Sequence, residues 1–249
     1  MPRPPLTDIA WDPPAMLGAP PVRSLTSAVF HRLRAEILGC RIAPGERLRP
    51  TEIARALAVS LSAVREALSR LAADGLVQIE DQKGFRASPV SITDLRDVTR
   101  TRVDIEGLAL RRAIDRGDAA WEDGIRAALD TLCATPSRRA DDPLVPNEAW
   151  AVPHERFHLA LLAACGSEWL LRFRATLFSQ SDRYRRLSVP AVPTDARDVV
   201  GEHRAIAAAT LARDADAAVA ALGRHYETTM QRALAAISEA LDPDEPGKP

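Results

Sequence analysis

The sequence predicts a mostly α-helical protein in two parts: three helices with a β-hairpin, followed by an all-α bundle of about six helices. Apolar residues recur at helical spacing through most of the chain, and two short β-prone stretches lie close together before residue 90. Charge also divides the chain. Residues 23–89 hold 11 basic and seven acidic side chains, whereas residues 90–249 hold 21 and 25. This asymmetry favours two modules with different partners.

The first two helices are separated by a turn. In "SLTSAVFHRLRAEILGC", Val29, Leu33 and Ile37 share one helical face, and Gly39 is placed to end the helix. The stretch "RIAPGERL" then predicts a Pro-Gly turn. A short second helix follows in "PTEIARALAVS", where Thr51 is placed as the cap.

A third helix and a hairpin complete the first part. Val64, Leu68 and Leu71 recur at helical spacing in "LSAVREALSRLAADGL", and Gly75 ends that helix. The strands "LVQIE" and "FRASP" are separated by "DQKG", a four-residue turn that ends in glycine. The order helix, helix, turn, helix, hairpin is that of a winged helix-turn-helix.

The chain changes character at Ile92, after which Ala, Leu and Arg dominate and β-branched runs are scarce. This composition predicts an all-α bundle. We expect its helices to be interrupted near residues 116–118, 136–146, 166, 190–194 and 214.

The predicted domains are a disordered proline-rich leader over 1–22, a DNA-binding part over 23–89, a helical part over 90–242 and a flexible tail over 243–249. Seven prolines in the first 22 residues support the disordered leader, which also lacks the pattern of a secretory signal. Three widely spaced cysteines favour a reducing compartment. Because no apolar run reaches the length of a membrane span, we expect a cytoplasmic protein with no membrane partner.

The second helix of a helix-turn-helix pair enters the major groove, and its first residues reach the bases. Arg65 is placed to pair with guanine, and Ser62 to contact a base or phosphate. Lys83 and Gly84 lie at the tip of the hairpin, where phosphate or the minor groove is within reach. The predicted DNA-binding residues are Arg49, Thr51, Ser60, Ser62, Arg65, Lys83 and Gly84. Any one of these arginines taken alone is more typical of a solvated helix face.

From Leu25 to Ser88 the chain resembles the DNA-binding domain of GntR-type bacterial transcription regulators. The family's L-x-P-G-x-x-L is matched by I-A-P-G-E-R-L over Ile42 to Leu48. The core V-S-x-x-x-V-R-E-A-L, over Val59 to Leu68, and a glycine-tipped wing are also shared. The resemblance implies a homodimer that binds a palindromic DNA operator. One position departs, since Leu61 stands where the family usually has an arginine. The loss of that arginine affects the expected affinity for DNA and the expected operator sequence. Leu61 can contact a thymine methyl instead.

Four of the five histidines lie in the helical part: His154, His158, His203 and His225. His154 and His158 share one helix face, and the other two lie on later predicted helices. Imidazoles from three helices form a plausible site for zinc, nickel, copper or iron. A lone histidine such as His31 is more often a surface or hydrogen-bonded core residue.

The helical part resembles the FCD ligand-binding domain of the FadR branch of GntR regulators, through "ERFHLALLAACGSEWLL" and "RTRVDIEGLALRRA". The resemblance implies a divalent metal, with zinc or nickel favoured here, at His154, His158, His203 and His225. His154 replaces the commoner Asp or Asn. Arg102 matches an arginine that faces the pocket and would clamp a carboxylate effector, while an ion pair with Glu106 is the alternative.

The stretch "HERFH" also matches H-E-x-x-H, in which a metalloprotease helix presents two zinc ligands and a base. No further histidine follows at the metzincin spacing. We therefore expect a ligand-responsive regulator, not an enzyme. The alternatives are a metal-dependent hydrolase with Glu155 as base, and a regulator whose metal is structural or is itself the signal.

Overall fold

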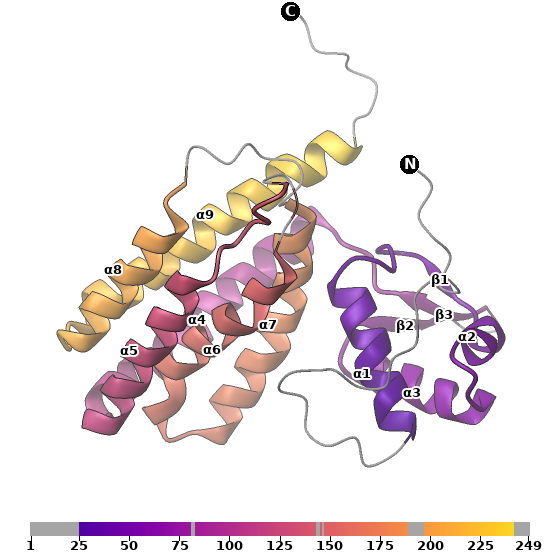
Figure 1. Cartoon of the computed structure of the whole chain (residues 1–249), viewed down its shortest axis with the longest axis horizontal. Coiled ribbons are helices and arrows are strands. Elements are labelled where there is room, and N and C mark those ends of the chain that lie inside the picture. Colours follow the sequence, from indigo (N-terminus) through magenta and orange to yellow (C-terminus); the bar gives the residue numbers. More distant parts are fainter. Residues whose placement is uncertain (1–24, 81–82, 143–144, 146, 189–196, 242–249) are drawn as a thin grey trace, which may run out of the picture. The chain divides into compact units, whose positions relative to one another are not determined.

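The computed structural model describes residues 25–80, 83–142, 145, 147–188 and 197–241 (Figure 1). Its contacts divide the chain into two compact units, with the boundary after Val90. Helices predominate in both, as the sequence predicts. The leader over 1–22 and the tail over 243–249 lie outside the described residues, as do Asp81 and Gln82 of the predicted turn.

The first unit combines three helices with a small antiparallel sheet. Its elements are α1 (Leu25–Leu38), β1 (Arg47–Leu48), α2 (Pro50–Ala56), α3 (Leu61–Ala73), β2 (Val77–Glu80) and β3 (Gly84–Ala87). The hairpin pairs β2 with β3, and β1 pairs with the other edge of β3, where Leu48 lies opposite Phe85. The sequence did not predict β1, because two residues are too few to show an alternating pattern.

The core of this unit lies between α1 and α3. Val29 and Leu33 of α1 are buried with Val64 and Leu68 of α3, at the positions that the helical spacing predicts. Burial of such side chains contributes about 1.5–3 kcal/mol each. Gly75, at a φ of 73°, ends α3 as predicted.

Thr51 does not cap α2, contrary to the prediction. Arg49 occupies the cap position without a side-chain hydrogen bond, and Pro50 begins the helix. Proline is favoured there because its fixed φ suits the helix and its missing N–H would have no partner in any case. Thr51 is therefore an exposed residue of the first turn.

The second unit is an all-α bundle, with six α-helices among its described residues, in agreement with the prediction. They are α4 (Ile92–Arg116), α5 (Ala119–Ala134), α6 (Ala151–Leu162), α7 (Glu168–Ser188), α8 (Val199–Leu211) and α9 (Ala215–Leu241). Two short 3-10 turns, η2 (Glu148–Trp150) and η3 (Ala163–Cys165), flank α6. Ser91, Asp118 and Asp198 cap α4, α5 and α8 through their side chains.

The long helix α4 is central to this bundle and packs against α6, α7 and α9. Its buried residues Leu110 and Ala113 join a core with Phe157 of α6 and Leu222 of α9. A glycine permits the close approach of α4 and α9, because a Cβ at Gly107 would lie 3.2 Å from Val219. The helices thereby bring their inner faces close enough to share one site.

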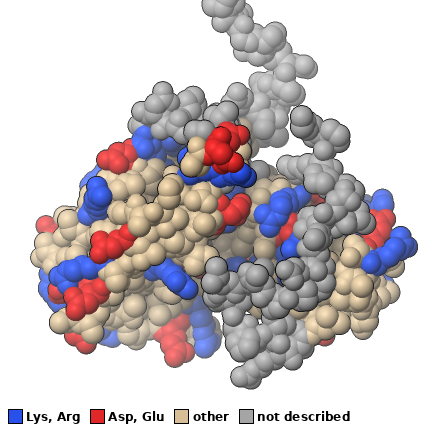
Figure 2. All heavy atoms as spheres, in the orientation of Figure 1, with Lys and Arg blue, Asp and Glu red and all other residues tan. Residues whose placement is uncertain are grey.

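The visible surface of the helical unit carries Lys and Arg interspersed with Asp and Glu (Figure 2). This face shows no broad region of one sign, in keeping with the nearly balanced charge of the chain. Among the described residues, the helices are all too short or too polar to span a membrane.

Candidate functional site

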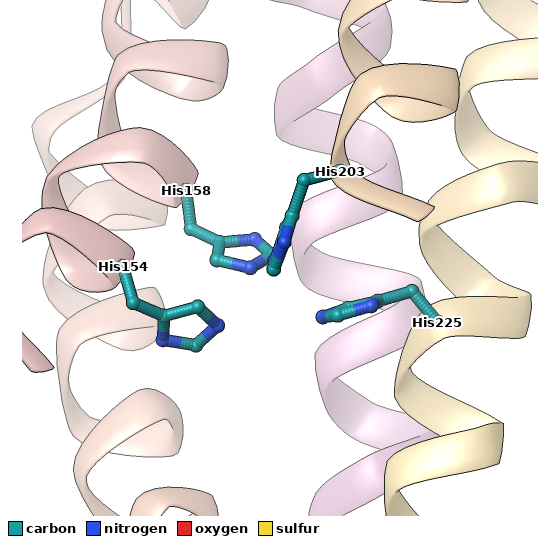
Figure 3. A group of neighbouring side chains, drawn as sticks. All are labelled: His154, His158, His203 and His225. Atoms are coloured by element: carbon teal, nitrogen blue, oxygen red, sulfur yellow. The ribbon is translucent and has the colours of Figure 1, made fainter. Parts of the chain in front are cut away.

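The four histidines predicted to bind a metal come together inside the helical unit (Figure 3). His154 and His158 project from α6, one turn apart, while His203 comes from α8 and His225 from α9. Pro153 does not disrupt this arrangement. It lies in the first turn of α6, where a proline is tolerated because few backbone N–H groups there have helical partners.

The cluster is compact and buried. Each histidine is at most 6% exposed. One ring nitrogen from each lies within 4.8 Å of those of the other three. The His203 and His225 ring centroids are 4.6 Å apart, and Trp150 stacks on His154 at 4.2 Å. Four imidazoles from three helices therefore share one small space.

Hydrogen bonds outside the cluster orient two of the rings. His225 Nδ1 lies 2.7 Å from Glu202 Oε2. Hydrogen bonds from Arg197 and His225 outweigh burial and lower the pKa of Glu202 to about 2, so the acceptor is a carboxylate. Nδ1 therefore carries the proton and donates it to Glu202. The other nitrogen of His225, Nε2, keeps its lone pair for a ligand.

A tyrosine orients His158 in the same way. The Tyr226 hydroxyl donates to Glu106 Oε2 at 2.6 Å, and its oxygen lies 3.2 Å from His158 Nδ1. Because the single hydroxyl hydrogen is already donated, the oxygen accepts from Nδ1–H. The lone pair of His158 is then on Nε2. Such outer hydrogen bonds fix the tautomer of metal-binding histidines in general.

Three nitrogens of the cluster are buried without a hydrogen-bond partner among the described residues. They are His154 Nδ1, His158 Nε2 and His203 Nε2. Leaving a buried polar atom unsatisfied costs about 1–3 kcal/mol. A cation in the shared space would remove this cost at each of these nitrogens that faces it, by accepting the lone pair.

Burial holds the cluster neutral. Desolvation, followed by the charges of neighbouring groups, lowers the pKa of His154 and His158 well below the usual value. It lowers the pKa of His203 to about 3 and also lowers that of His225. Neutral imidazole is the form that binds metals, so these rings need lose no proton at neutral pH.

The donor set fits a divalent cation. Imidazole nitrogens bind zinc at about 2.0–2.1 Å, so two ligands of one ion lie no more than about 4.2 Å apart. The 4.8 Å spread of the ring nitrogens exceeds this limit by about 0.6 Å, so the rings would move inward to bind one ion. Nitrogen ligands alone suit zinc, nickel or copper better than magnesium or calcium, which prefer oxygen. The cluster can therefore hold a transition-metal ion.

Arg102 lies beside the cluster and forms the ion pair with Glu106 that was the alternative to a ligand clamp. Its Nε donates to Glu106 at 2.8 Å, its Nη1 donates to Ser181 at 2.7 Å, and the guanidinium lies 3.9 Å above the Tyr226 ring. Arg102 also lines a cavity with His154 and His225. The two roles are compatible, since these bonds use only some of its five N–H groups.

The glutamate of "HERFH" does not join the histidines. The Glu155 side chain is 49% exposed and lies 3.7 Å from Arg174, whereas His154 and His158 are buried. Its position next to His154 in the sequence turns it toward another side of α6. The arrangement that a metalloprotease needs, with a carboxylate poised over metal-bound water, is not formed.

The predicted DNA-reading residues lie at the start of α3. Ser60 caps the helix by accepting a hydrogen bond from Ala63 N at 3.2 Å, and its hydroxyl lies 3.1 Å from that of Ser62. Ser62 and Arg65 are exposed, and Leu61 is 37% exposed. The first two turns of α3 thus present hydroxyl, apolar and guanidinium groups to solvent.

The other predicted DNA contacts are exposed around this helix. Arg49 forms a surface ion pair with Glu52 at 2.9 Å. Lys83 is exposed at the wing, and its carbonyl accepts a hydrogen bond from Arg47 at 2.8 Å. Gly84 follows at a φ of 94°, a left-handed conformation that favours glycine.

Sequence reasoning missed the residues that support the cluster. Glu202 precedes His203 and Tyr226 follows His225, but adjacency in sequence does not reveal which side chains meet. Glu106 was noted only as a partner of Arg102. Nothing in the sequence indicated that the Trp150 ring stacks on His154, because Trp150 lies in η2, just after a predicted break between helices.

Two family models together match most of the chain. Residues 25–86 match bacterial regulatory proteins of the gntR family, and residues 97–228 match the FCD domain. The first match covers the helix-turn-helix and wing, and the second covers all four histidines.

Curated relatives match over most of their length. An HTH-type transcriptional regulator, BphR, from Paraburkholderia xenovorans (strain LB400) is 40% identical over 209 residues, 84% of this chain and 85% of that protein. The HTH-type transcriptional repressor GlaR of Escherichia coli (strain K12) is 32% identical over 220 residues, 85% of this chain and 99% of that protein.

Solved structures share the fold. E. coli McbR/YncC has a TM-score of 0.69 at 21% identity, covering 88% of this chain and 99% of that one. A putative transcriptional regulator GntR from Rhodococcus sp. RHA1 has a TM-score of 0.67 at 22% identity, covering 85% and 98%.

Proposed function

The chain belongs to the GntR family of bacterial regulatory proteins and carries an FCD domain, and on that premise we propose that it is a cytoplasmic, ligand-responsive transcription regulator of the FadR subfamily. It acts as a homodimer on a palindromic operator, since a two-fold dimer presents two reading heads to two half-sites. We place the junction between its DNA-binding and effector-binding domains at residues 89–90.

In this proposal α3 reads the operator. Arg65 contacts guanine, and Ser62 contacts a base or phosphate. Ser60 also shapes the helix start, while the remaining predicted contacts hold the sugar-phosphate backbone. These are Arg49, Thr51, Lys83 and Gly84. Leu61 packs against a thymine methyl in place of the family's arginine contact, which shifts the preferred base.

The four histidines hold a divalent metal ion, zinc or nickel. When bound, the ion supplies a positive charge that attracts an anionic effector. Arg102 lines the same cavity and donates hydrogen bonds to a carboxylate of the effector, a small organic acid. The effector favours one arrangement of the two DNA-binding heads, and thereby changes operator affinity through a population shift.

The observation that carries this proposal is a cluster of four buried histidines, two of which, His154 and His225, line one cavity with Arg102, in a chain that also carries a helix-turn-helix. The exposed position of Glu155 disfavours the hydrolase alternative. The remaining alternative is a metal site that is purely structural or that senses the metal itself. The experiments below distinguish it from a site that binds the effector.

DNA binding is tested by fluorescence anisotropy with labelled DNA from upstream of the gene, at two salt concentrations and with scrambled competitor. We expect specific binding that weakens with salt. R65Q should lose specific affinity by about 1–3 kcal/mol, whereas R112Q, an exposed arginine of α4, should bind as the parent does. Equal binding to operator and scrambled DNA would contradict the proposal.

Effector sensing is tested by thermal shift with small organic acids, with and without a chelator. Stabilisation that needs both metal and acid supports a shared pocket. Equal stabilisation after chelation would contradict coordination of the effector. A response of DNA binding to metal alone would instead favour a metal sensor.

A further inference from the structure

Tyr184 connects the end of α7 to the start of α4. It is buried, with 1% of the residue exposed. Its hydroxyl accepts a hydrogen bond from the Ser91 N–H at 3.1 Å and donates one to Asp94 Oδ2. Burial, followed by the hydrogen bond to Asp94, raises the pKa of Tyr184, so the hydroxyl keeps the proton that it donates. One tyrosine of α7 therefore holds two residues at the start of another helix.

The two residues that Tyr184 holds lie directly after the DNA-binding unit, which ends at Val90. Ser91 caps α4 by accepting a hydrogen bond from the Asp94 N–H at 3.0 Å. In a capping box, the side chain at the third helical position also accepts from the N–H of the cap residue. Here the Asp94 carboxylate is joined to that N–H through the Tyr184 hydroxyl. The first turn of α4, which continues directly from the DNA-binding unit, thus depends on a residue of α7.

The same end of α7 contacts the histidine cluster through Trp150. The Arg185 guanidinium lies 5.1 Å from the centroid of the Trp150 ring, and Trp150 stacks on His154 at 4.2 Å. Tyr184 lines the same cavity as these three residues. A series of contacts therefore leads from a predicted metal ligand to the residue that holds Ser91.

Ion pairs reinforce the link between α7 and η2. Asp182 pairs with Arg185 at 2.6 Å and with Arg186 at 2.9 Å, and Arg186 also pairs with Glu148 of η2 at 2.7 Å. Asp182 is buried, so water screens its two pairs little. Glu148 is exposed, and its pair contributes less. A movement of η2 is therefore transmitted mainly to the last turns of α7.

A bound cation would draw the four rings together, because their nitrogens spread over 4.8 Å and one zinc ion allows no more than about 4.2 Å. Trp150 is stacked on His154 and would follow it. Restraint of one packed group limits the motion of its neighbours, and amide hydrogen exchange measures such ordering.

We propose that Tyr184 is the positioning residue through which occupancy of the histidine cluster orders the first turn of α4, and with it the junction to the DNA-binding unit. The inference rests on the proposed function and deepens it, since it takes the cluster as the metal site of a regulator. Tyr184 itself touches neither the ion nor DNA in this account.

Hydrogen exchange on the full-length protein, with zinc and after chelation, tests this role by mass spectrometry of the segment that contains Ser91 and Asp94. We expect this segment to exchange about fivefold or more slowly with zinc, the lower end of typical coupling between sites. Tyr184→Phe should exchange rapidly in both states, because the Ser91 N–H has lost its acceptor. A tyrosine that only supports the fold would leave exchange at this segment independent of zinc in the parent.

Thr210→Val is the matched control. It removes another buried hydroxyl of the same unit, one that donates to the Ile206 carbonyl at 2.8 Å, so zinc should still slow exchange at Ser91. Zinc affinity measured for each variant shows that the cluster is still filled, and melting temperatures show that the variants are folded.

Arg185→Gln is a second variant that keeps the Tyr184 hydroxyl. It removes the guanidinium that lies against Trp150, and we expect it to reduce the zinc effect at Ser91. A full zinc effect in R185Q would overturn the route through Trp150. The role of Tyr184 is disproved if zinc does not slow exchange at Ser91 in the parent, or if zinc slows it equally in Y184F.

Operator binding by the same samples separates this inference from the proposed function. Specific DNA binding by a parent whose α4 does not respond to zinc would retain the regulator and remove this role of Tyr184. A zinc response that is lost in Y184F, in a protein that binds no operator, would retain the role of Tyr184 and overturn the regulator.

Discussion

At the scale of single residues, hydrogen bonds outside the histidine cluster decide which nitrogen faces inward. Glu202 accepts from His225, and Tyr226 accepts from His158 while donating to Glu106. Both histidines therefore present Nε2 to the shared space. Metal affinity should depend on these partners, although neither Tyr226 nor Glu106 is itself expected to touch the ion.

Removing the Tyr226 hydroxyl tests this dependence. Tyr226→Phe leaves His158 Nδ1–H without its acceptor, and we expect zinc affinity to fall about 10- to 100-fold. Competition with a chromophoric chelator measures the change. Tyr184→Phe is the control, because that hydroxyl bonds Ser91 and Asp94 instead of a histidine, and its zinc affinity should match the parent's. Unchanged affinity in Y226F would exclude a positioning role.

The lowered pKa values of the histidines predict how the stability of the metal-free protein depends on pH. A histidine with a folded pKa below its unfolded value of about 6.5 binds more protons when unfolded, so its stabilising contribution is complete above that pH and declines below it. We expect the melting temperature of metal-free protein to fall between pH 7.5 and pH 5. His203→Gln should flatten this slope, because it removes one proton-binding group. If the melting temperatures of the parent and H203Q depended equally on pH, protonation of His203 would not contribute to the pH dependence.

At the scale of elements, the approach of α4 to α9 places Arg102, Glu106 and Tyr226 in one network. Gly107 allows it, because any side chain there meets Val219. A helix interior ordinarily disfavours glycine by about 0.5–1 kcal/mol relative to alanine. The contact between the helices outweighs that preference here.

Gly107→Val should destabilise the protein by about 1–3 kcal/mol through overpacking. Gly124 of α5 gives the opposite case, because open space surrounds the position of its Cβ. Gly124→Ala should therefore stabilise by about 0.5–1 kcal/mol. Denaturant unfolding measures both changes. If the two variants shifted stability in the same direction, close helix packing would not explain Gly107.

At the scale of the whole molecule, a metal bound by the four histidines would tie together three helices. The histidines come from α6, α8 and α9. A ligand that binds only the folded state stabilises it by mass action. The helical unit should therefore unfold at a lower temperature after chelation.

Zinc at 1,000 times its dissociation constant should add about 4 kcal/mol to the stability of the helical unit. Calorimetry with zinc and after chelation measures this difference. His203→Ala should remove the zinc effect, while His31→Ala, which changes a histidine of the DNA-binding unit outside the cluster, should preserve it. A zinc effect of equal size in H203A would place the binding site elsewhere.

The sequence predicted much of the molecule because its signals were local or periodic. Helical spacing located the helices, glycine marked the end of α3, and the family motifs identified the DNA-binding head. The four histidines could be grouped because two lie one turn apart and the resemblance supplied the others. The cap of α2 was predicted wrongly, since proline at the first helical position displaced Thr51 from that role.

The sequence by itself determined the mostly helical fold, the winged helix-turn-helix and the histidines that gather. Only the tertiary structure decided that Glu155 stays outside the cluster and that Tyr226 and Glu202 set the tautomers. The physical reason is that spacing along a helix fixes which residues share a face. The partners of that face depend on how separate helices pack, and this is settled by long-range contacts such as that of Gly107 with α9.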